Sequence, residues 1–91
     1  MNFSSVDPTL RDWASRNRMR LATQYQDADV RSFELVGPDG RAQIWVEVNT
    51  EITVHLWDYR KRKQVFAVDG STLANGLDDA LRLAKIWCGM P

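Results

Sequence analysis

Residues 41–57, RAQIWVEVNTEITVHLW, alternate apolar and polar side chains on either side of a polar break at 49–51. Alternation with a period of two is typical of strands that bury one face. A three-residue turn at 49–51 gives a register in which all paired side chains on one face are aliphatic: Val48 with Ile52, Val46 with Val54, and Ile44 with Leu56. The stretch therefore predicts a β-hairpin with one continuous apolar face.

A strand before this hairpin extends the same face. The GPDG stretch at 37–40 favours a four-residue turn, because Pro fixes its own φ and Gly tolerates a positive φ. This turn joins a strand over 30–36 to one over 41–49 and aligns two more apolar pairs: Leu35 with Ala42, and Phe33 with Ile44. A further strand, over about 19–25, alternates in the same way and leads into a polar turn at 26–29.

A strand after the hairpin extends the face on the other side. The strand over 52–59 leads through a three-residue turn at 60–62 into a fifth strand over 64–69. This turn pairs Leu56 with Phe66, and Val54 with Val68. Three turns chosen independently agree on one core face, which supports a meander of about five antiparallel strands.

Helical spacing frames the strands at both ends of the chain. Asp7 is expected as N-cap of a helix over about 8–16, with Asn17 as its left-handed stop. Apolar side chains at helical spacing predict a second helix over 72–88, capped by either Ser71 or Asn75. Within it, Gly76 is expected to weaken the helix.

The whole chain, residues 1–91, is therefore predicted to be a single α+β domain with the order α-β-β-β-β-β-α. The sheet is expected to be an antiparallel meander, with the N-terminal and the C-terminal helix packed on one of its faces. Two short helices cover only one face of a five-stranded sheet, so the other face is expected to be at least partly exposed.

Composition narrows the expected setting of the protein. The chain has 12 basic and 12 acidic residues, whereas dedicated nucleic-acid binders usually carry a basic excess. Cys88 is the only cysteine, so it has no partner for an internal disulfide. We find no pattern of a signal peptide and no apolar run long enough to span a membrane, and we expect a cytoplasmic protein.

The uncovered sheet face carries the candidate site. The register places three aromatic side chains, Trp45, Trp57 and Tyr59, on this face together with His55, and the basic run at 60–63 follows directly. Aromatic side chains rimmed by polar groups often mark a contact surface, although they also stabilise open sheets by cross-strand packing. We therefore predict a partner-binding surface made of these residues: Trp45, His55, Trp57, Tyr59, Arg60, Lys61, Arg62 and Lys63.

No residue pattern indicates an enzyme, a metal site or a cofactor. His55 is the only histidine, the register brings no Ser or Cys nucleophile beside it, and Glu47 is its only nearby metal-ligating candidate. Cys88 lies on the apolar stripe of the second helix and is expected to be a buried, unreactive thiol. We therefore expect no catalytic residue and no bound cofactor.

Nucleic-acid binding is the alternative that the same residues leave open. Aromatic side chains on a sheet beside basic loops can stack single-stranded bases, and the residues at 60–63 supply four cationic side chains for phosphate. Against this reading, the second helix opens with GSTLANGLDD, which is acidic and contains no lysine. A basic run at a hairpin tip is also a common solvated turn.

The stretches WVEVN, HLWDY, KQVFAVD and LANGLDDALRLA, with the overall layout of residues 8–88, resemble small bacterial immunity proteins of polymorphic-toxin systems. This resemblance implies a single cytoplasmic domain that binds and blocks one cognate toxin. It carries over no individual binding residue. The layout is almost as similar to that of uncharacterised small bacterial α+β proteins, and an exposed aromatic face also leaves a homodimer open.

Overall fold

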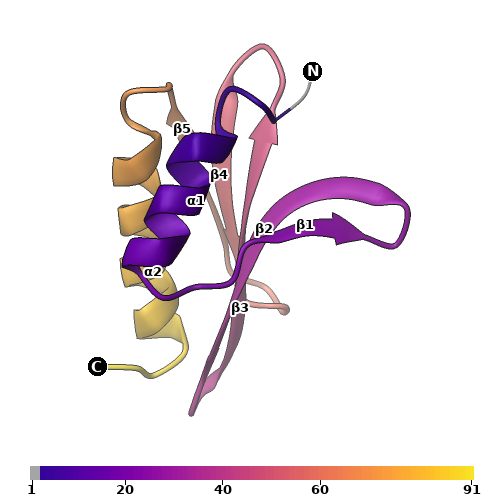
Figure 1. Cartoon of the computed structure of the whole chain (residues 1–91). Helices are drawn as coiled ribbons and strands as arrows, with labels where there is room; N and C mark the ends of the chain where they lie inside the picture. Colours follow the sequence, from indigo (N-terminus) through magenta and orange to yellow (C-terminus); the bar gives the residue numbers. More distant parts are fainter. Residues whose placement is uncertain (1–2) are drawn as a thin grey trace.

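The computed structural model describes residues 3–91 and confirms the predicted α+β fold (Figure 1). Five antiparallel strands form one open sheet in the order β1-β2-β3-β4-β5, a simple meander. In chain order the elements are α1 (Asp7–Arg16), β1 (Ala22–Tyr25), β2 (Ala28–Gly37), β3 (Gly40–Val48), β4 (Ile52–Trp57), β5 (Lys63–Val68) and α2 (Leu73–Trp87). Neither helix within residues 3–91 is long and apolar enough to cross a bilayer.

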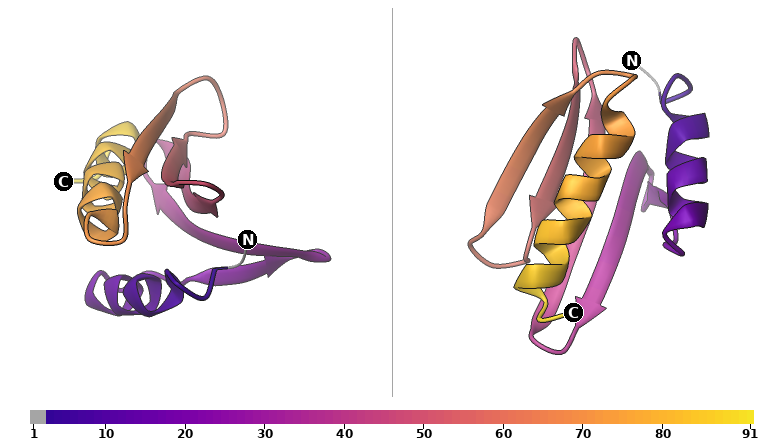
Figure 2. Two further views of the ribbon diagram at one scale, coloured as in Figure 1. Left: turned by 90° about the horizontal axis from the view of Figure 1, so that it is seen from above. Right: turned by 90° about the vertical axis from the view of Figure 1, so that its left-hand side faces the viewer.

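Both helices lie on the same side of the sheet, as expected (Figures 1 and 2). α2 packs across β3, β4 and β5, and α1 lies beside α2. The core between them is built from side chains that the alternation assigned to one sheet face, together with the apolar stripes of the helices. Trp13 of α1 is fully buried and meets the ring of Phe33 on β2 edge to face, with 5.0 Å between the ring centroids. Within residues 3–91, neither helix covers the opposite sheet face (Figures 1 and 2).

The register of the central strands matches the sequence prediction. β3 and β4 pair Val48 with Ile52 and Ile44 with Leu56, and β2 pairs Leu35 with Ala42 on β3. The predicted register of β4 and β5 is wrong by two residues, because Val54 pairs with Phe66, and Ile52 with Val68. A two-residue shift keeps every side chain on its predicted face, since side chains alternate with a period of two.

The physical reason for this shift is the loop at residues 58–62. Its first residue, Asp58, accepts hydrogen bonds from the backbone N–H groups of Arg60 and Arg62 at 2.8 and 3.1 Å. The backbone N–H of Asp58 in turn donates to the Arg62 carbonyl oxygen. These bonds stabilise a five-residue loop instead of the expected three-residue turn, so β5 begins at Lys63 and β4 ends at Trp57.

α1 begins one residue before its predicted start and ends at Arg16 as predicted, but its N-cap and its left-handed stop both differ from the expected residues. Val6 occupies the N-cap position, and Asp7 is the first helical residue, whose carboxylate binds Arg31 instead of capping the helix. At the other end Arg18, with φ 54°, takes the left-handed conformation expected of Asn17. Two backbone hydrogen bonds close this end, from Arg18 to the Ser15 carbonyl oxygen and from Met19 to that of Ala14.

β1 is shorter than the predicted strand over 19–25. It begins at Ala22, and its pairing with β2 is irregular between Ala22 and Gln24, where the register shifts. The turn between β1 and β2 is tight: Tyr25 pairs with Ala28, and Gln26 has a φ of 53°. This hairpin bends away from the helices and projects beyond the rest of the sheet (Figures 1 and 2). Bulges increase the local bend and twist of a strand in this way.

Asp69, which is neither of the two expected caps, stabilises the start of α2. The carboxylate of Asp69 accepts hydrogen bonds from the backbone N–H groups of Ser71 and Thr72 at 2.9 and 3.0 Å. Neither Ser71 nor Asn75 caps the helix, which begins at Leu73 with Thr72 at the N-cap position. The helix then continues through Gly76, which is buried.

Gly76 allows α2 to approach the sheet closely. A methyl group on its Cα would lie 2.6 Å from Cγ1 of Val68 and 3.6 Å from Cγ2 of Val54. Gly76→Ala should gain about 1 kcal/mol in helix propensity, but the overpacking against a stiff valine should cost about 1–3 kcal/mol, so we expect net destabilisation. Urea denaturation followed by circular dichroism measures it.

The matched control for this prediction is Asn75→Ala, which changes an exposed position of the same helix. It should be neutral or slightly stabilising, because no neighbouring side chain has to move. Combining Gly76→Ala with Val68→Ala should recover part of the loss through a favourable coupling between the two sites. A Gly76→Ala variant more stable than the original chain would contradict the close-approach explanation.

Candidate functional site

The outer face of the sheet carries two aromatic pairs. The first joins Trp45 on β3 to His55, its cross-strand neighbour on β4, with the rings nearly parallel at 9° and 4.9 Å between centroids. The second joins Trp57, at the end of β4, to Tyr59 in the following loop, at 4.7 Å. All four side chains are half-buried, so the rings shield one another while keeping one side open to solvent.

Polar groups fix the first pair. Nε1 of Trp45 donates a hydrogen bond of 2.9 Å to the carboxylate of Glu47. The same carboxylate lies 3.2 Å from Nε2 of His55, and the hydroxyl of Thr53 lies 2.9 Å from that nitrogen. The carboxylate oxygen of Glu47 and the hydroxyl oxygen of Thr53 therefore both contact the same ring nitrogen, Nε2 of His55. A catalytic relay uses the two nitrogens separately, one for the nucleophile and one for the carboxylate, so these contacts orient the imidazole and do not form such a relay.

The second pair is held by an unusual backbone conformation. The sequence predicts Tyr59 at the end of a strand over 52–59, but β4 ends at Trp57 and Tyr59 lies in the following loop. Its φ is 65°, a left-handed conformation that costs a bulky residue about 1–2 kcal/mol. Its hydroxyl donates a hydrogen bond of 2.6 Å to Glu34 on β2, and the guanidinium of Arg41 lies 4.3 Å from its ring centroid. Burial and the hydrogen bond to Glu34 raise the pKa of Tyr59. The left-handed conformation of Tyr59 and its contacts with Glu34 and Arg41 therefore hold its ring on the outer face.

A groove of about 970 Å³ runs over this face between the β1–β2 hairpin and strands β3 and β4. The three predicted aromatic residues Trp45, Trp57 and Tyr59 line it, and Tyr25 of β1 adds a fourth ring that is 67% exposed. Basic, acidic and amide side chains also line the groove, among them Arg20, Gln24, Asp29, Glu34, Arg41, Gln43 and Glu47. His55 does not line it and supports Trp45 from the neighbouring strand.

The basic run at 60–63 is divided by the structure. Arg62 bonds to the carboxylate of Asp58 at 2.9 Å and lies over the ring of Trp87 on α2, 4.8 Å from its centroid. The bond from Arg62 and the two loop N–H groups lower the pKa of Asp58. Lys63 approaches the ring of Trp57, with its Nζ 6.0 Å from the centroid.

The two remaining basic residues, Arg60 and Lys61, are exposed, and within residues 3–91 their side chains form no hydrogen bond or ion pair. None of the four basic residues lines the large groove. Arg60 and Arg62 instead line a second depression of about 340 Å³, which shares Tyr59 and Arg41 with the first. The groove lined by aromatic residues and the depression lined by Arg60 and Arg62 are thus adjacent but distinct.

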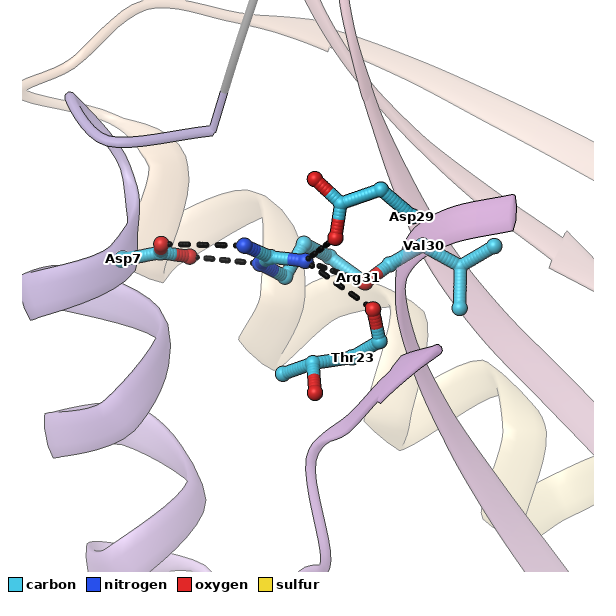
Figure 3. Close-up of polar contacts among 5 residues, drawn as sticks. All are labelled: Asp7, Thr23, Asp29, Val30 and Arg31. Carbon is cyan, nitrogen blue, oxygen red and sulfur yellow. Dashed lines mark hydrogen bonds and ion pairs between the residues drawn. The ribbon is translucent and has the colours of Figure 1, made fainter. Parts of the chain in front are cut away.

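Arg31 is the residue that sequence reasoning missed. Its guanidinium forms a two-bonded ion pair with Asp7 of α1, at 2.6 and 3.1 Å, and also bonds to the Asp29 carboxylate at 2.8 Å (Figure 3). Two carbonyl oxygens of the β1–β2 hairpin, those of Val30 and Thr23, accept further bonds at 2.6 and 3.3 Å. Arg31 therefore ties the start of α1 to the hairpin that forms one wall of the groove.

Two further features bear on the chemistry of the chain. Within residues 3–91, no three His, Cys, Asp or Glu side chains come together in a way that would hold a metal ion. Cys88 is fully buried as predicted, and burial raises its pKa, so the thiol is kept in its less reactive protonated form.

Comparisons with protein-family models, with curated proteins and with solved structures found no match to this chain. The functional conclusion therefore depends on the geometry of the outer face. That face combines half-buried aromatic rings, fixed polar groups and a groove bounded by a projecting hairpin.

Proposed function

We propose that this protein is a non-enzymatic domain that binds a partner protein through the outer-face groove. The observation that carries this proposal is the position of three rings, those of Trp45, Trp57 and Tyr59, in a groove of about 970 Å³ on the sheet face that no helix covers. Aromatic side chains held in place beforehand lose little entropy on binding and dominate the energetics of many protein interfaces.

The groove polar groups suit a protein surface better than a strongly charged polymer. Acidic and basic side chains both line it, including Glu34 and Glu47 beside Arg20 and Arg41. Mixed charge of this kind gives specificity through complementary pairs, whereas a phosphate backbone favours an excess of one sign. Gln43 adds an amide to the lining of the groove, where it can pair with the backbone of a bound segment.

An immunity protein that blocks a cognate toxin is one form of this proposal. It is supported by the resemblance in size and layout described above, and it requires a tight interface around a few rigid aromatic residues. The same proposal includes a cytoplasmic location, because a single buried cysteine such as Cys88 cannot form the internal disulfide bonds that are typical of proteins in an oxidising compartment.

The proposal predicts that Trp45→Ala combined with Trp57→Ala weakens binding of the partner at least tenfold, because both rings line the groove. The partner would be captured from native lysate on the immobilised chain, identified by mass spectrometry, purified, and titrated against each variant. Both tryptophans lie outside the core, so the double variant should keep a cooperative thermal transition.

The matched control is Ile86→Ala, which removes an apolar side chain that is 66% exposed on α2. It should leave the affinity unchanged. Equal affinity of the double tryptophan variant and the control would refute the proposed site. Capture of single-stranded nucleic acid with a steep salt dependence, reduced by Arg60→Ala with Lys61→Ala, would replace the proposal with nucleic-acid binding.

A further inference from the structure

β5 forms a free edge of the sheet. No other element of residues 3–91 lies beyond this strand (Figure 2), so alternate backbone N–H and C=O groups point away from β4 without a strand partner. The other edge is different, because β1 has only four residues and its pairing is interrupted by a register shift. β5 has six residues and pairs with β4 in one continuous register.

Apart from Lys63 at its first position, β5 lacks the features that usually prevent strand pairing. Edge strands are commonly protected by proline, by a bulge or by charged side chains, especially lysine. Residues 64–68 read QVFAV and contain no charge and no proline. Val65 is 52% exposed, Ala67 is exposed, and Phe66 is only half-buried against the core. A regular, uncharged and apolar edge of this kind favours pairing with another strand.

The charges at the two ends of β5 favour pairing with a second copy of the same chain. Two copies related by a two-fold axis at Phe66 would place Lys63 of each opposite Asp69 of the other, and Val65 opposite Ala67. A register two residues away in either direction loses the pairing of Lys63 with Asp69. An odd shift would bring inward-facing side chains opposite outward-facing ones, which a continuous sheet does not allow.

The two charged groups are available for this contact. The hydrogen bonds that the Asp69 carboxylate accepts from Ser71 and Thr72 all end on Oδ1, and within residues 3–91 no hydrogen bond or ion pair involves Oδ2. These bonds also lower the pKa of Asp69, so the carboxylate stays ionised at neutral pH. Nζ of Lys63 lies 6.0 Å from the centroid of the Trp57 ring and forms no hydrogen bond or ion pair within residues 3–91.

We propose that the protein forms a two-fold symmetric homodimer by antiparallel pairing of β5 with β5 of a second copy. The two five-stranded sheets then continue as one sheet of ten strands. The pairing residues Val65 and Ala67 do not line the outer-face groove, which is bounded by the hairpin at the opposite edge. Each subunit therefore keeps its groove open, and the dimer does not depend on the function proposed for that groove.

The test uses complementary charge variants of the full chain. Val65→Lys with Ala67→Lys sets lysines opposite lysines in the proposed register, and Val65→Glu with Ala67→Glu does the same with carboxylates. Each should raise the dimer dissociation constant by more than about tenfold, because like-charged pairs repeat on both sides of the two-fold axis. Light scattering after gel filtration should give the dimer mass for the original chain and the 10.5 kDa monomer mass for each variant.

Mixing the two variants should restore a dimer, since every opposed pair then joins a lysine to a glutamate. Circular dichroism of each variant alone checks that it is folded, and Ile86→Lys, a charge added at an exposed position of α2, should leave the dimer intact. The proposal is overturned if the original chain is monomeric, if both variants remain dimeric, or if folded variants fail to associate when mixed. If the monomeric variants bind a groove partner as tightly as the original chain does, the dimer and the proposed groove function are independent of each other.

Discussion

Replacement of Trp13 by alanine is expected to lower the free energy of unfolding by about 3–5 kcal/mol, the range found when a large aromatic side chain is removed from a core. Trp13 is fully buried and joins three elements. It lies on α1, its ring meets Phe33 on β2, and its Nε1 donates a hydrogen bond of 2.9 Å to Asp78 on α2. A cavity at this junction therefore loosens both helices at once, and urea denaturation followed by circular dichroism measures the loss.

Two variants separate the contributions to this effect. Trp13→Phe keeps most of the ring in the core but removes the donor to Asp78, and it should cost about 1 kcal/mol for the hydrogen bond plus a smaller cavity term. Trp45→Ala removes a half-buried tryptophan from the outer face and should cost clearly less than Trp13→Ala, because its ring packs against His55 and not within the core. Similar losses in the free energy of unfolding for Trp13→Ala and Trp45→Ala would contradict this prediction, because packing on the outer face would then stabilise the fold as much as packing in the core.

The faces of the sheet could be predicted from sequence because side-chain alternation is a local property. Val54 and Leu56 face the core whether or not the neighbouring strand is shifted by two residues, so the wrong register of β5 left the predicted faces correct. The length of the loop that set the register depends on the bonds of Asp58 to Arg60 and Arg62, which only the folded loop forms.

The groove could not be predicted in the same way. Its wall requires the β1–β2 hairpin to bend outward, and this bend accompanies an irregular pairing near Ala22 that no composition pattern marks. Contacts between distant segments, such as that of Trp13 with Asp78, are equally invisible to local spacing. One signal was present. Arg31 has the same parity as Phe33 and Leu35, so the alternation already placed a charged residue on the core face, where it needs an ionic partner.

The pair formed by Arg31 and Asp7 should make the stability of the protein depend on pH. Both side chains are largely buried, with 11% and 14% of their surfaces exposed, and the hydrogen bond from Arg31 holds the pKa of Asp7 below its ordinary value of 3.8. A lowered pKa in the folded state means that the unfolded state binds the proton more tightly. The stability gained from the pair is therefore complete well above pH 3.8 and is lost as the pH falls through the lower, folded-state pKa.

Asp7→Asn should accordingly cost about 1–3 kcal/mol near pH 7, since it removes a charge-assisted bond and leaves a mostly buried guanidinium with only Asp29 as an ionic partner. The stabilities of the variant and the original chain should converge as the pH is lowered below about 4, because protonation then removes the same charge from Asp7. Chemical denaturation at a series of pH values from 7 to about 3 measures both curves.

Asp12→Asn provides the matched control, because Asp12 pairs with Arg16 one turn along α1, but these side chains are 67% and 58% exposed. Its cost near pH 7 should be no more than about 0.5 kcal/mol, as for other exposed pairs one turn apart on a helix. A cost for Asp7→Asn that stays constant down to pH 3 would show that the contact acts through packing and not through charge. Convergence at low pH, together with faster amide exchange in β1 and β2 of the variant, would instead establish that the ion pair of Arg31 and Asp7 holds the hairpin wall of the groove against α1.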